Sequence, residues 1–426
     1  MSLSFRRFRP ALALLAALSG PAALAGPMTW ISLGEDAYLV LRQQQARIDQ
    51  VEMHPMSVLA PAESGLVNQS QRVYLVQVDE DALTALSTAV HRELHRCGGY
   101  VVHASAEEGR QSLARTRALA WSPDGLLKAQ ATVPSYKIND SKKVNKLMPK
   151  VQEARILAGI ERLSAYRNRY YTTSHGVAAS NDLAAAWQAL AAGRSDVTVE
   201  QFTHAAWPQK SVILTIRGTQ VPDELVVIGG HLDSTVGFTG ENSRAPGADD
   251  DASGIASLQE VMQVLLENGY KPKRSLQFIA YAAEEVGLRG SSAIANSYRT
   301  QGKNVVGALQ LDMTNYQGSS SSDIVLITDY TNAAQNDFVQ ALATAYLPSL
   351  TVTRSLCGYA CSDHASWTSN GFASSFPFEA PFSNSNPHIH TTGDTLDKSG
   401  NSAAHALKFS RLALAYAVEL GSDASR

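Results

Sequence analysis

The segment Val226-Val227-Ile228-Gly229-Gly230-His231-Leu232-Asp233-Ser234-Thr235 places an uninterrupted apolar run directly before a histidine and an aspartate. A run of β-branched residues that ends in glycines and polar groups is typical of a buried strand that stops at the edge of a sheet. Acids and imidazoles are costly in a core, whereas such strand ends open on the crevice where α/β proteins bind ligands. The segment therefore predicts a buried strand with reactive residues at its end.

The same arrangement recurs twice further along the chain, because Phe278–Ala283 ends at Glu284-Glu285 and Ala308–Leu311 ends at Asp312. Further polar groups stand in the loop Asp249-Asp250-Asp251 and in Pro387-His388-Ile389-His390-Thr391-Thr392. Each has an ordinary explanation by itself, since an Asp run is usually a solvated turn and paired Glu residues suit a helix N-terminus. Together they indicate one shared site.

The number of candidate ligands favours two metal ions over one. A single catalytic zinc takes three protein ligands and keeps a position for water. Five ligands are available here: His231, Asp250, Glu285, Asp312 and His390. Two ions about 3.5–4 Å apart can share one carboxylate, an arrangement suited to amide hydrolysis. Glu284 is left over beside them, and Asp233 could accept the second ring N–H of His231 and fix its tautomer.

Six motifs carry a resemblance to a known family: GGHLDST, APGADDDASG, AYAAEEVGLRGS, LQLDMTNY, CGYACSDHASW and IHTTGDTLD. They occur in the order found in the secreted bacterial leucyl aminopeptidases, which belong to the dinuclear-zinc aminopeptidase family related to glutamate carboxypeptidase. The resemblance covers roughly residues 150–420. It implies a secreted enzyme that cleaves the N-terminal peptide bond of peptides with a free N-terminus and prefers leucine and other large apolar residues.

The resemblance also implies a role for each residue of the site. His231 and Asp312 are expected to hold one Zn²⁺, Glu285 and His390 the other, and Asp250 to bridge them. Glu284 is expected to act as general base on the zinc-bridging water, with Asp233 supporting the ligands from behind. A cis peptide bond is expected between Asp250 and Asp251. His388 is interpreted as a rim residue, and His364 as a residue that either supports the ligands or lies at the rim, neither of them being a ligand.

The metal ligands alone do not determine the preferred side chain or the direction of cleavage, and other residues bear on both. A substrate pocket is expected from five apolar residues close in sequence to the ligands or to the cysteine pair: Met313, Tyr359, Phe378, Phe382 and Ile389. Several of them are equally explained as core. Tyr359 is also a candidate hydrogen-bond donor to the oxyanion that develops during the reaction. A carboxypeptidase would need an arginine clamp, and Arg289 is better explained as a structural ion-pair residue. A one-zinc glutaminyl cyclase and a receptor-like domain without metals remain as alternatives.

The chain divides into four segments. Residues 1–25 combine Arg6, Arg7 and Arg9 with a short apolar run, which indicates a signal peptide. Residues 26–127 are interpreted as an α+β propeptide domain, or else as a retained binding module. Residues 128–147 are Lys-rich and are expected to be a linker with the processing site for an activating protease. Residues 148–426 alternate helix and strand patterns, which predicts one α/β domain with a mixed, largely parallel sheet and helices on both faces.

Composition agrees with an exported protein. A net charge of −3 gives no reason to expect binding to nucleic acid or to a membrane after signal removal, and a monomer is expected. Cys357 and Cys361 are close enough to close a tight loop in an oxidising compartment, and the resemblance implies that they form a disulfide. Zinc binding by these thiols would need two more ligands. Cys97 is interpreted as a buried free thiol.

Overall fold

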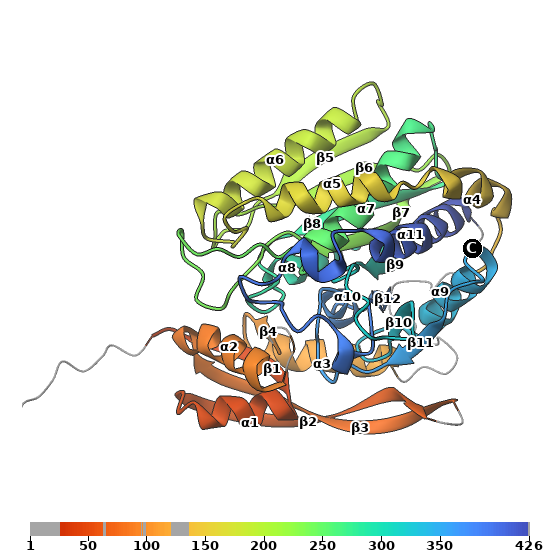
Figure 1. The fold of residues 1–426 in the computed structure, drawn as a ribbon. Helices are drawn as coiled ribbons and strands as arrows, with labels where there is room; N and C mark the ends of the chain where they lie inside the picture. Colours follow the sequence, from red (N-terminus) through yellow and green to blue (C-terminus); the bar gives the residue numbers. More distant parts are fainter. Residues whose placement is uncertain (1–25, 63–64, 95, 97–98, 121–135, 425–426) are drawn as a thin grey trace, which may run out of the picture.

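The computed structural model describes residues 26–62, 65–94, 96, 99–120 and 136–424. It contains an N-terminal domain (residues 26–120) and a larger C-terminal domain (residues 136–424), which lies above it in Figure 1. The expected signal peptide, Cys97 and residues 121–135 of the expected propeptide and linker fall outside the described residues.

A six-stranded mixed sheet forms the centre of the C-terminal domain, with the strand order β12-β9-β7-β8-β6-β5. The strands are β5 (Val197–Phe202), β6 (Ser211–Ile216), β7 (Val221–His231), β8 (Arg274–Tyr281), β9 (Asn304–Gln310) and β12 (Ser374–Ser375). The four strands from β12 to β8 run parallel, whereas β6 is antiparallel to β8 and β5 is antiparallel to β6. The parallel part ends at one edge, where the predicted ligands begin.

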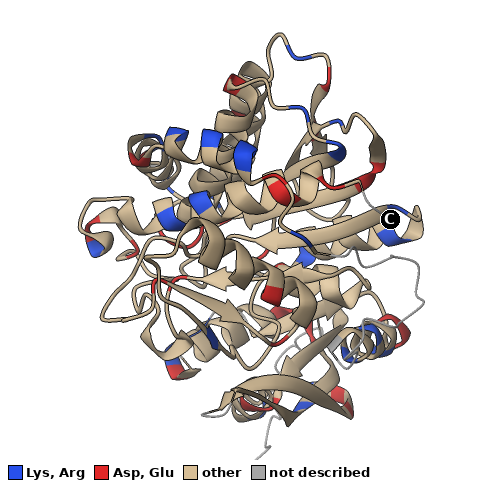
Figure 2. Ribbon diagram, turned by 90° about the vertical axis from the view of Figure 1, so that its right-hand side faces the viewer, with Lys and Arg blue, Asp and Glu red and all other residues tan. Residues whose placement is uncertain are grey.

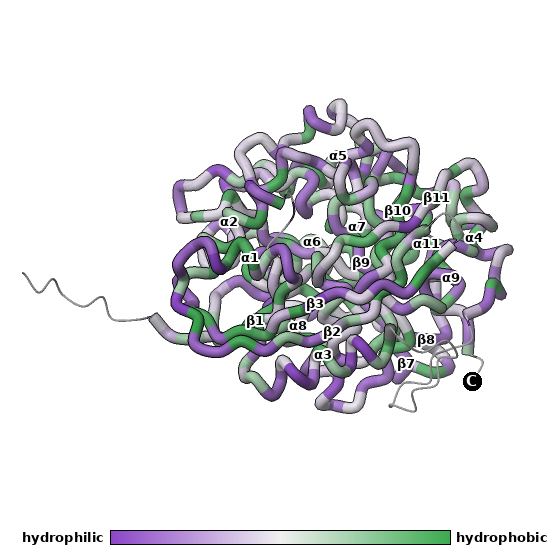
Figure 3. Tube along the Cα trace, turned by 90° about the horizontal axis from the view of Figure 1, so that it is seen from below, coloured by the Kyte–Doolittle hydropathy of each residue, from purple (hydrophilic) through white to green (hydrophobic). Residues whose placement is uncertain are grey.

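Helices cover both faces of this sheet, as predicted. They are α5 (Glu153–Ser164), α6 (Ser174–Leu190), α7 (Ala252–Glu267), α8 (Arg289–Thr300), α10 (His364–Ser369) and α11 (Ala404–Ser422). Alternate residues of a strand point to opposite faces, so Val226 and Ile228 pack in one core with α5, α7 and α11. Leu225 and Val227 pack in a second core with α8 and α10. Figure 3 shows the hydrophobic character of these strands along the chain trace.

A smaller three-stranded sheet, in the order β11-β10-β13, adjoins the main one. It consists of β10 (Ile324–Ile327), β11 (Val352–Ser355) and β13 (Pro377–Phe378), with α9 (Ala333–Tyr346) between β10 and β11. The described residues also contain four short 3₁₀ turns, one in the N-terminal domain and three in the C-terminal domain: Glu80–Ala82, Met148–Lys150, Phe382–Asn384 and Leu396–Ser399. The loop after β11 carries the two cysteines, so this small sheet positions the disulfide segment beside the main sheet.

The N-terminal domain is an α+β unit, as predicted. It contains β1 (Met28–Gly34), α1 (Glu35–Gln43), β2 (Ile48–Ala62), β3 (Gly65–Asp79), α2 (Leu83–Leu94), β4 (Tyr100–His103) and α3 (Ala106–Ala120). Its strands form an antiparallel sheet in the order β2-β3-β1-β4. Its own core joins β1 and β3 to α1 and α2.

The two domains share a hydrophobic core. Leu75 and Leu113 of the N-terminal domain pack in one buried cluster with Leu288, Tyr330 and Ala365 of the C-terminal domain. The backbone N–H of Val102 donates to the carbonyl of Gly287 at 3.2 Å, which continues the contact along the main chain. The N-terminal domain is therefore packed against its partner rather than tethered loosely to it.

The end of the expected linker over residues 128–147 differs from that prediction. Residues 141–147 form a helix, α4 (Ser141–Leu147), and its Val144 and Leu147 are buried in the main core of the C-terminal domain. Tyr136 donates its hydroxyl hydrogen to Gln335 at 2.9 Å. The lysine-rich composition concealed this helix because its apolar residues are few. Tyr136, the first described residue after the gap, already packs with the C-terminal domain.

The N-cap of helix α7 is Asp251, whose carboxylate accepts the N–H of Gly254. Ser253 donates to the carbonyl of Asp249 at 2.8 Å. Gly269 follows the helix at φ +61°, as expected of a C-terminal glycine.

Charged residues of both signs are spread over the ribbon of both domains (Figure 2). Among the residues described, no helix combines the length and the apolar character that crossing a bilayer requires.

Candidate metal centre

The five predicted ligands converge at the ends of the parallel strands. His231 is the last residue of β7 and pairs with Tyr281, the last residue of the neighbouring strand β8. Glu285 lies in the loop that follows β8. Gly229 of β7 pairs with Gln310 of β9, two residues before Asp312. Asp250 precedes α7, and His390 comes from a turn between Pro387 and His390 rather than from a strand.

The ligand atoms form two overlapping groups. One contains His231, Asp250 and Asp312, and the other contains Asp250, Glu285 and His390, with all atoms of a group within 4.8 Å of one another. Oδ1 of Asp250 lies 2.9 Å from Nε2 of His231, and its Oδ2 lies 3.1 Å from Nε2 of His390. Asp250 thus offers one oxygen to each group, which is the arrangement of a bridging carboxylate.

The spacing and the chemistry of these atoms fit zinc. Two tetrahedral zinc bonds of about 2.0–2.1 Å leave their donor atoms about 3.3 Å apart. Nε2 of His231 lies 3.6 Å from Oδ1 of Asp312, and Nε2 of His390 lies 2.8 Å from Oε2 of Glu285. Within the described part of the chain, no hydrogen bond reaches the buried Oδ1 of Asp312 or Oε1 of Glu285. Buried carboxylate oxygens without donors are suited to a cation.

Electrostatics support the same conclusion. Burial acts to lower the pKa of His231, but the carboxylates of Asp312 and Glu284 raise it well above its ordinary value. Burial and then the nearby Asp250 raise the pKa of Glu285 to about 7. These shifts show a buried region dense in negative charge, where positive charge is strongly favoured.

Asp233 supports the site differently from the prediction. Its two carboxylate oxygens accept the backbone N–H groups of Glu284 and Glu285, at 3.0 Å and 3.2 Å. Nδ1 of His231 lies 3.1 Å from the main-chain carbonyl of Asp233, closer than the 3.6 Å to the carboxylate. The tautomer of His231 is therefore set mainly by the main chain, while the Asp233 carboxylate positions the glutamate pair.

Two further carboxylates, which sequence reasoning did not single out, hold the ligand loops. Asp251 accepts the N–H of His231 at 3.0 Å and that of Met313 at 3.2 Å, so it joins the ends of β7 and β9. Asp394 accepts the N–H groups of Asp249 and Asp250, both at 3.1 Å. Both residues lie inside recognised motifs, which was the available signal. The peptide bond between Asp250 and Asp251 is cis, which confirms that expectation.

Glu284 belongs to neither ligand group, although it is buried and adjoins Glu285. Burial raises the pKa of its carboxyl well above the usual range, and the charges of Asp363 and Glu285 add to this effect. A carboxylate that readily takes up a proton, and that is not needed as a ligand, can serve as a base.

The five predicted pocket residues occupy one buried apolar cluster. Met313, Tyr359, Phe378 and Ile389 belong to it, and Phe382 packs against it. Met313 and Ile389 are direct neighbours of the ligands Asp312 and His390, which places the cluster beside the metal centre. Ile327 and Phe376 also belong to this cluster but had no motif to reveal them.

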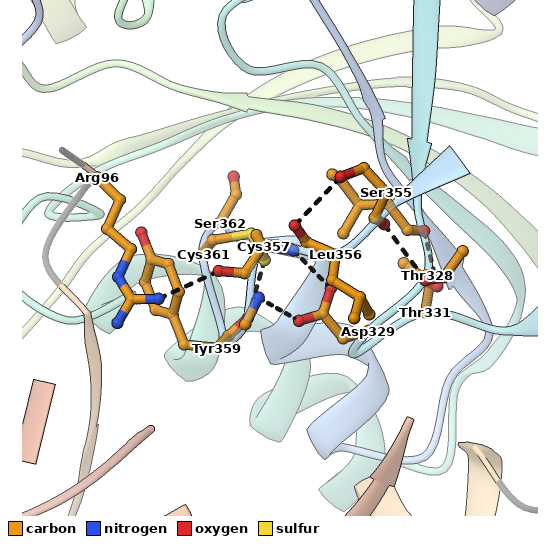
Figure 4. The surroundings of a disulfide bond; sticks show 12 residues. Arg96, Thr328, Asp329, Thr331, Ser355, Leu356, Cys357, Tyr359, Cys361 and Ser362 are labelled. Atoms are coloured by element: carbon orange, nitrogen blue, oxygen red, sulfur yellow. Dashed lines mark hydrogen bonds between the residues drawn. A yellow bond between two sulfur atoms is a disulfide. The ribbon is translucent and has the colours of Figure 1, made fainter. Parts of the chain in front are cut away.

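Cys357 and Cys361 belong to the same cluster and form the expected disulfide, with an S–S distance of 2.10 Å. Asp329 accepts the N–H groups of Cys357 and Gly358 (Figure 4), at 3.0 Å and 2.6 Å. The disulfide loop therefore forms part of the wall of the apolar cluster.

The remaining interpretations concern residues at the periphery. His388 is not among the ligand groups. His364 is completely buried, stacks on Phe376 with ring centroids 4.8 Å apart, and has its pKa lowered by burial to about 3. It is therefore a core residue rather than a rim residue. Arg289 forms an ion pair with Glu80 at 2.9 Å, as a structural residue would, and its partner lies in the N-terminal domain.

The N-terminal domain covers the centre. Helix α2 supplies Thr84, Ser87, Thr88 and His91 to a pocket whose other wall includes Glu285 and His390. The rings of His91 and His390 have centroids 4.9 Å apart. Arg96 lies 4.5 Å above the ring of Tyr359 and donates to the carbonyl of Cys357 (Figure 4). Neither contact was visible from sequence, because nothing in residues 26–127 matches the six motifs.

Comparison with known proteins agrees with this geometry. Residues 211–416 match peptidase family M28. A probable aminopeptidase of Saccharomyces cerevisiae is 34% identical over 304 residues, which cover 69% of this chain and 80% of the yeast protein. Leucine aminopeptidase 1 of Coccidioides posadasii is 35% identical over 304 residues, covering 68% of this chain and 76% of that protein.

A solved structure extends the similarity beyond the metal centre. The structure of the LapA aminopeptidase from Legionella pneumophila matches with a TM-score of 0.73 and 28% identity, covering 94% of this chain and all of that one. Since residues 148–426 are about two thirds of the chain, this match must include most of the N-terminal domain. The yeast and Coccidioides relatives are named as a probable aminopeptidase and a leucine aminopeptidase, and the chain itself belongs to peptidase family M28.

Proposed function

We propose that the chain is a secreted two-zinc aminopeptidase, made in a latent form, which removes leucine and other large apolar residues from the N-terminus of peptides. The observation that carries this proposal is the pair of overlapping ligand groups that share Asp250. The names of the relatives, aminopeptidase and leucine aminopeptidase, support the activity. The apolar cluster next to Asp312 and His390 supports the preference for large apolar side chains.

The residues of the chain divide the chemistry between them. Zinc ions held by the five ligands would acidify the attacking water and polarise the scissile carbonyl. Glu284 would accept the proton of that water and return it to the leaving amine. Asp233 keeps Glu284 in place through the backbone N–H of that residue. The Tyr359 phenol would hydrogen-bond to the oxygen on which negative charge develops.

Cleavage from the N-terminal end is favoured over carboxypeptidase action. A free α-ammonium group suits a centre rich in carboxylates, whereas a terminal carboxylate needs a cationic clamp. Arg289, the arginine within the motifs, is engaged with Glu80. Several carboxyl groups lie buried around the centre, among them Glu284 and Asp363.

Latency follows from the position of the N-terminal domain. Helix α2 occupies the space in front of Glu285 and His390 that a peptide would need. We therefore infer that residues 26–127 are a propeptide, that an activating protease cleaves before Tyr136, and that residues 1–25 direct export. The disulfide supports an oxidising destination, because such bonds persist outside the cytosol.

The test is an assay of full-length and protease-treated protein on leucyl anilide, with an N-acetylated leucyl anilide as the matched control. The proposal expects cleavage of the free substrate alone, loss of activity with a chelator, and recovery in proportion to two zinc ions per chain. Activity on C-terminally free but N-blocked peptides would favour the carboxypeptidase. Full recovery with one zinc, together with cyclisation of N-terminal glutamine, would favour the glutaminyl cyclase.

A further inference from the structure

A buried arginine lies behind the metal centre in the segment between α5 and α6. Arg169 is 0% exposed, and its guanidinium donates to main-chain carbonyls rather than to carboxylates. The acceptors are Leu232 (2.8 Å), Leu163 (3.1 Å), Pro246 (2.6 Å) and Gly247 (2.9 Å). Burying a charge is costly, so a fully satisfied arginine at this depth calls for an explanation.

Three of the four acceptors of Arg169 belong to the two segments that supply ligands, and the fourth, Leu163, lies in α5. Leu232 directly follows His231, and Gly247 begins the turn that leads to Asp250. The main chain reinforces the link, because the N–H of Arg169 donates to Ser234 at 3.0 Å. A planar guanidinium with five fixed donors can hold several carbonyls at set positions, which a flexible ammonium cannot.

The charge of Arg169 also matters at this location. The carboxylates that act on it electrostatically are Asp251, Asp394, Asp250 and Asp233. These residues hold or support the metal ligands, and none of them is a hydrogen-bond partner of the guanidinium among the bonds that Arg169 forms. A fixed cation behind them reduces their mutual repulsion in the protein without metal.

We propose that Arg169 is a positioning residue for the metal centre. It ties the segment after His231 to the turn before Asp250 and offsets the negative charge of the surrounding carboxylates, so that the ligands are in place before metal binds. This inference rests on the proposed zinc centre. It adds a residue from outside the six motifs, since Arg169 precedes all of them in the sequence.

The test compares Arg169→Met and Arg169→Lys with Arg274→Met. Arg274 is a matched control because it is also buried in the C-terminal domain, bonds to a main-chain carbonyl at Leu420 and to Glu224, and stands at the start of β8, opposite the end that leads to the ligands. The full-length proteins are loaded with zinc, and the transfer of zinc to a chelator is followed. Unfolding of the metal-free proteins is measured alongside.

We expect Arg169→Met to lower zinc affinity by about 10–100-fold, as loss of a residue that supports ligands does. Arg169→Lys keeps the positive charge but loses the planar set of guanidinium donors. Its zinc affinity should therefore lie between those of Arg169→Met and the wild type. Arg274→Met should lose stability while keeping zinc affinity within about 3-fold of the wild type, well short of that range.

Three results would overturn the inference. Arg169→Met could bind zinc as the wild type does, or Arg274→Met could lose as much affinity, which would indicate general destabilisation. If Arg169→Met does not fold, wild-type affinity in Arg169→Lys would overturn it equally. Wild-type protein that binds no zinc would instead refute the proposed function, so the two failures are distinguishable.

Discussion

The carboxylates of this centre have different roles, which depend on the groups that each one contacts. Asp233 lies beside the ligands, but its oxygens are taken up by the N–H groups of Glu284 and Glu285. Asp250 has its oxygens directed at His231 and His390, and these contacts, against the effect of burial, hold its pKa below the usual range. The same type of side chain is thus a support at one position and the proposed bridging ligand at another, according to the groups that face it.

Replacing Asp233 by Asn tests this division. An amide has one acceptor oxygen, so one of the two N–H groups would face an NH₂ group, at a cost of about 1–3 kcal/mol for a buried unpaired donor. We expect the Glu284–Glu285 turn to shift, lowering kcat by about 10-fold or more, in line with a loss of this size. Steady-state kinetics measure the fall in kcat, and the zinc content shows whether metal binding changes with it. Unchanged kinetics would show that the turn is held by other contacts.

Replacing Glu284 by Gln tests the assigned base. Gln keeps the shape but cannot accept the proton, so kcat should fall by about 10²–10⁴-fold while zinc content stays at the wild-type level. Glu285→Gln is the matched control on the adjacent residue, and it should reduce zinc binding because Glu285 is in a ligand group. Near-normal turnover of Glu284→Gln with its zinc bound would contradict the assignment.

Among the elements, the start of α7 is joined by hydrogen bonds to the ends of two strands. Asp251 caps this helix and also accepts the N–H groups of His231 and Met313. Gly254 lies in the first turn because a Cβ there would come within 2.3 Å of both Asp251 Oδ1 and the carbonyl of Leu311. A glycine stands in the first turn because the main chain just after β9 passes close to it.

Gly254→Ala should therefore destabilise the protein although alanine favours helices. The helical gain of about 1 kcal/mol is outweighed by overpacking, for which we expect a net loss of about 1–3 kcal/mol. Urea unfolding of the metal-free protein measures this without a contribution from bound metal. Gly240→Ala is the control, since a Cβ there meets nothing within 4 Å, and it should stay within about 0.5 kcal/mol of the wild type. An equal effect of both changes would refute the packing argument.

For the whole molecule, the proposed latency depends on the contact between the two domains. This contact combines the shared core around Leu113 and Leu288, the ion pair of Arg289 with Glu80, and Arg96 over Tyr359. Interfaces with a hydrophobic core of this kind resemble those of permanent complexes. The N-terminal domain is thus held by packing as well as by the covalent connection.

Cutting the connection alone should not activate the protein. With a specific protease site inserted in residues 121–135, we expect the cleaved domains to co-elute and activity on leucyl anilide to stay low until the N-terminal domain is digested. Arg96→Ala removes a desolvated cation–π contact worth about 2 kcal/mol and should speed its release. Size-exclusion chromatography measures whether the cleaved domains co-elute, and the gain of activity after dilution measures how fast the N-terminal domain is released. Full activity immediately on cleavage, with wild-type Arg96, would show that the covalent link alone maintains latency.

Much of this could be predicted from the sequence because the ligands follow apolar runs directly. Val226–Ile228 and Phe278–Ala283 mark the strands, and His231 and Glu285 follow within a few residues, so local order already places them at one sheet edge. The six motifs predicted the candidate ligands that the structure brings together, the disulfide between Cys357 and Cys361, and the family. The apolar pocket residues were found because two of them adjoin ligands.

Other features were decided by the tertiary structure alone. The cover of α2 over His390, the helix α4 in a lysine-rich stretch and the position of Arg169 depend on contacts between residues far apart in the chain. Arg96 and Tyr359 are 263 positions apart in the sequence, yet their side chains touch. A local pattern records which residues a strand or helix buries, but not what it is buried against, because the partner surface exists only once the chain has folded.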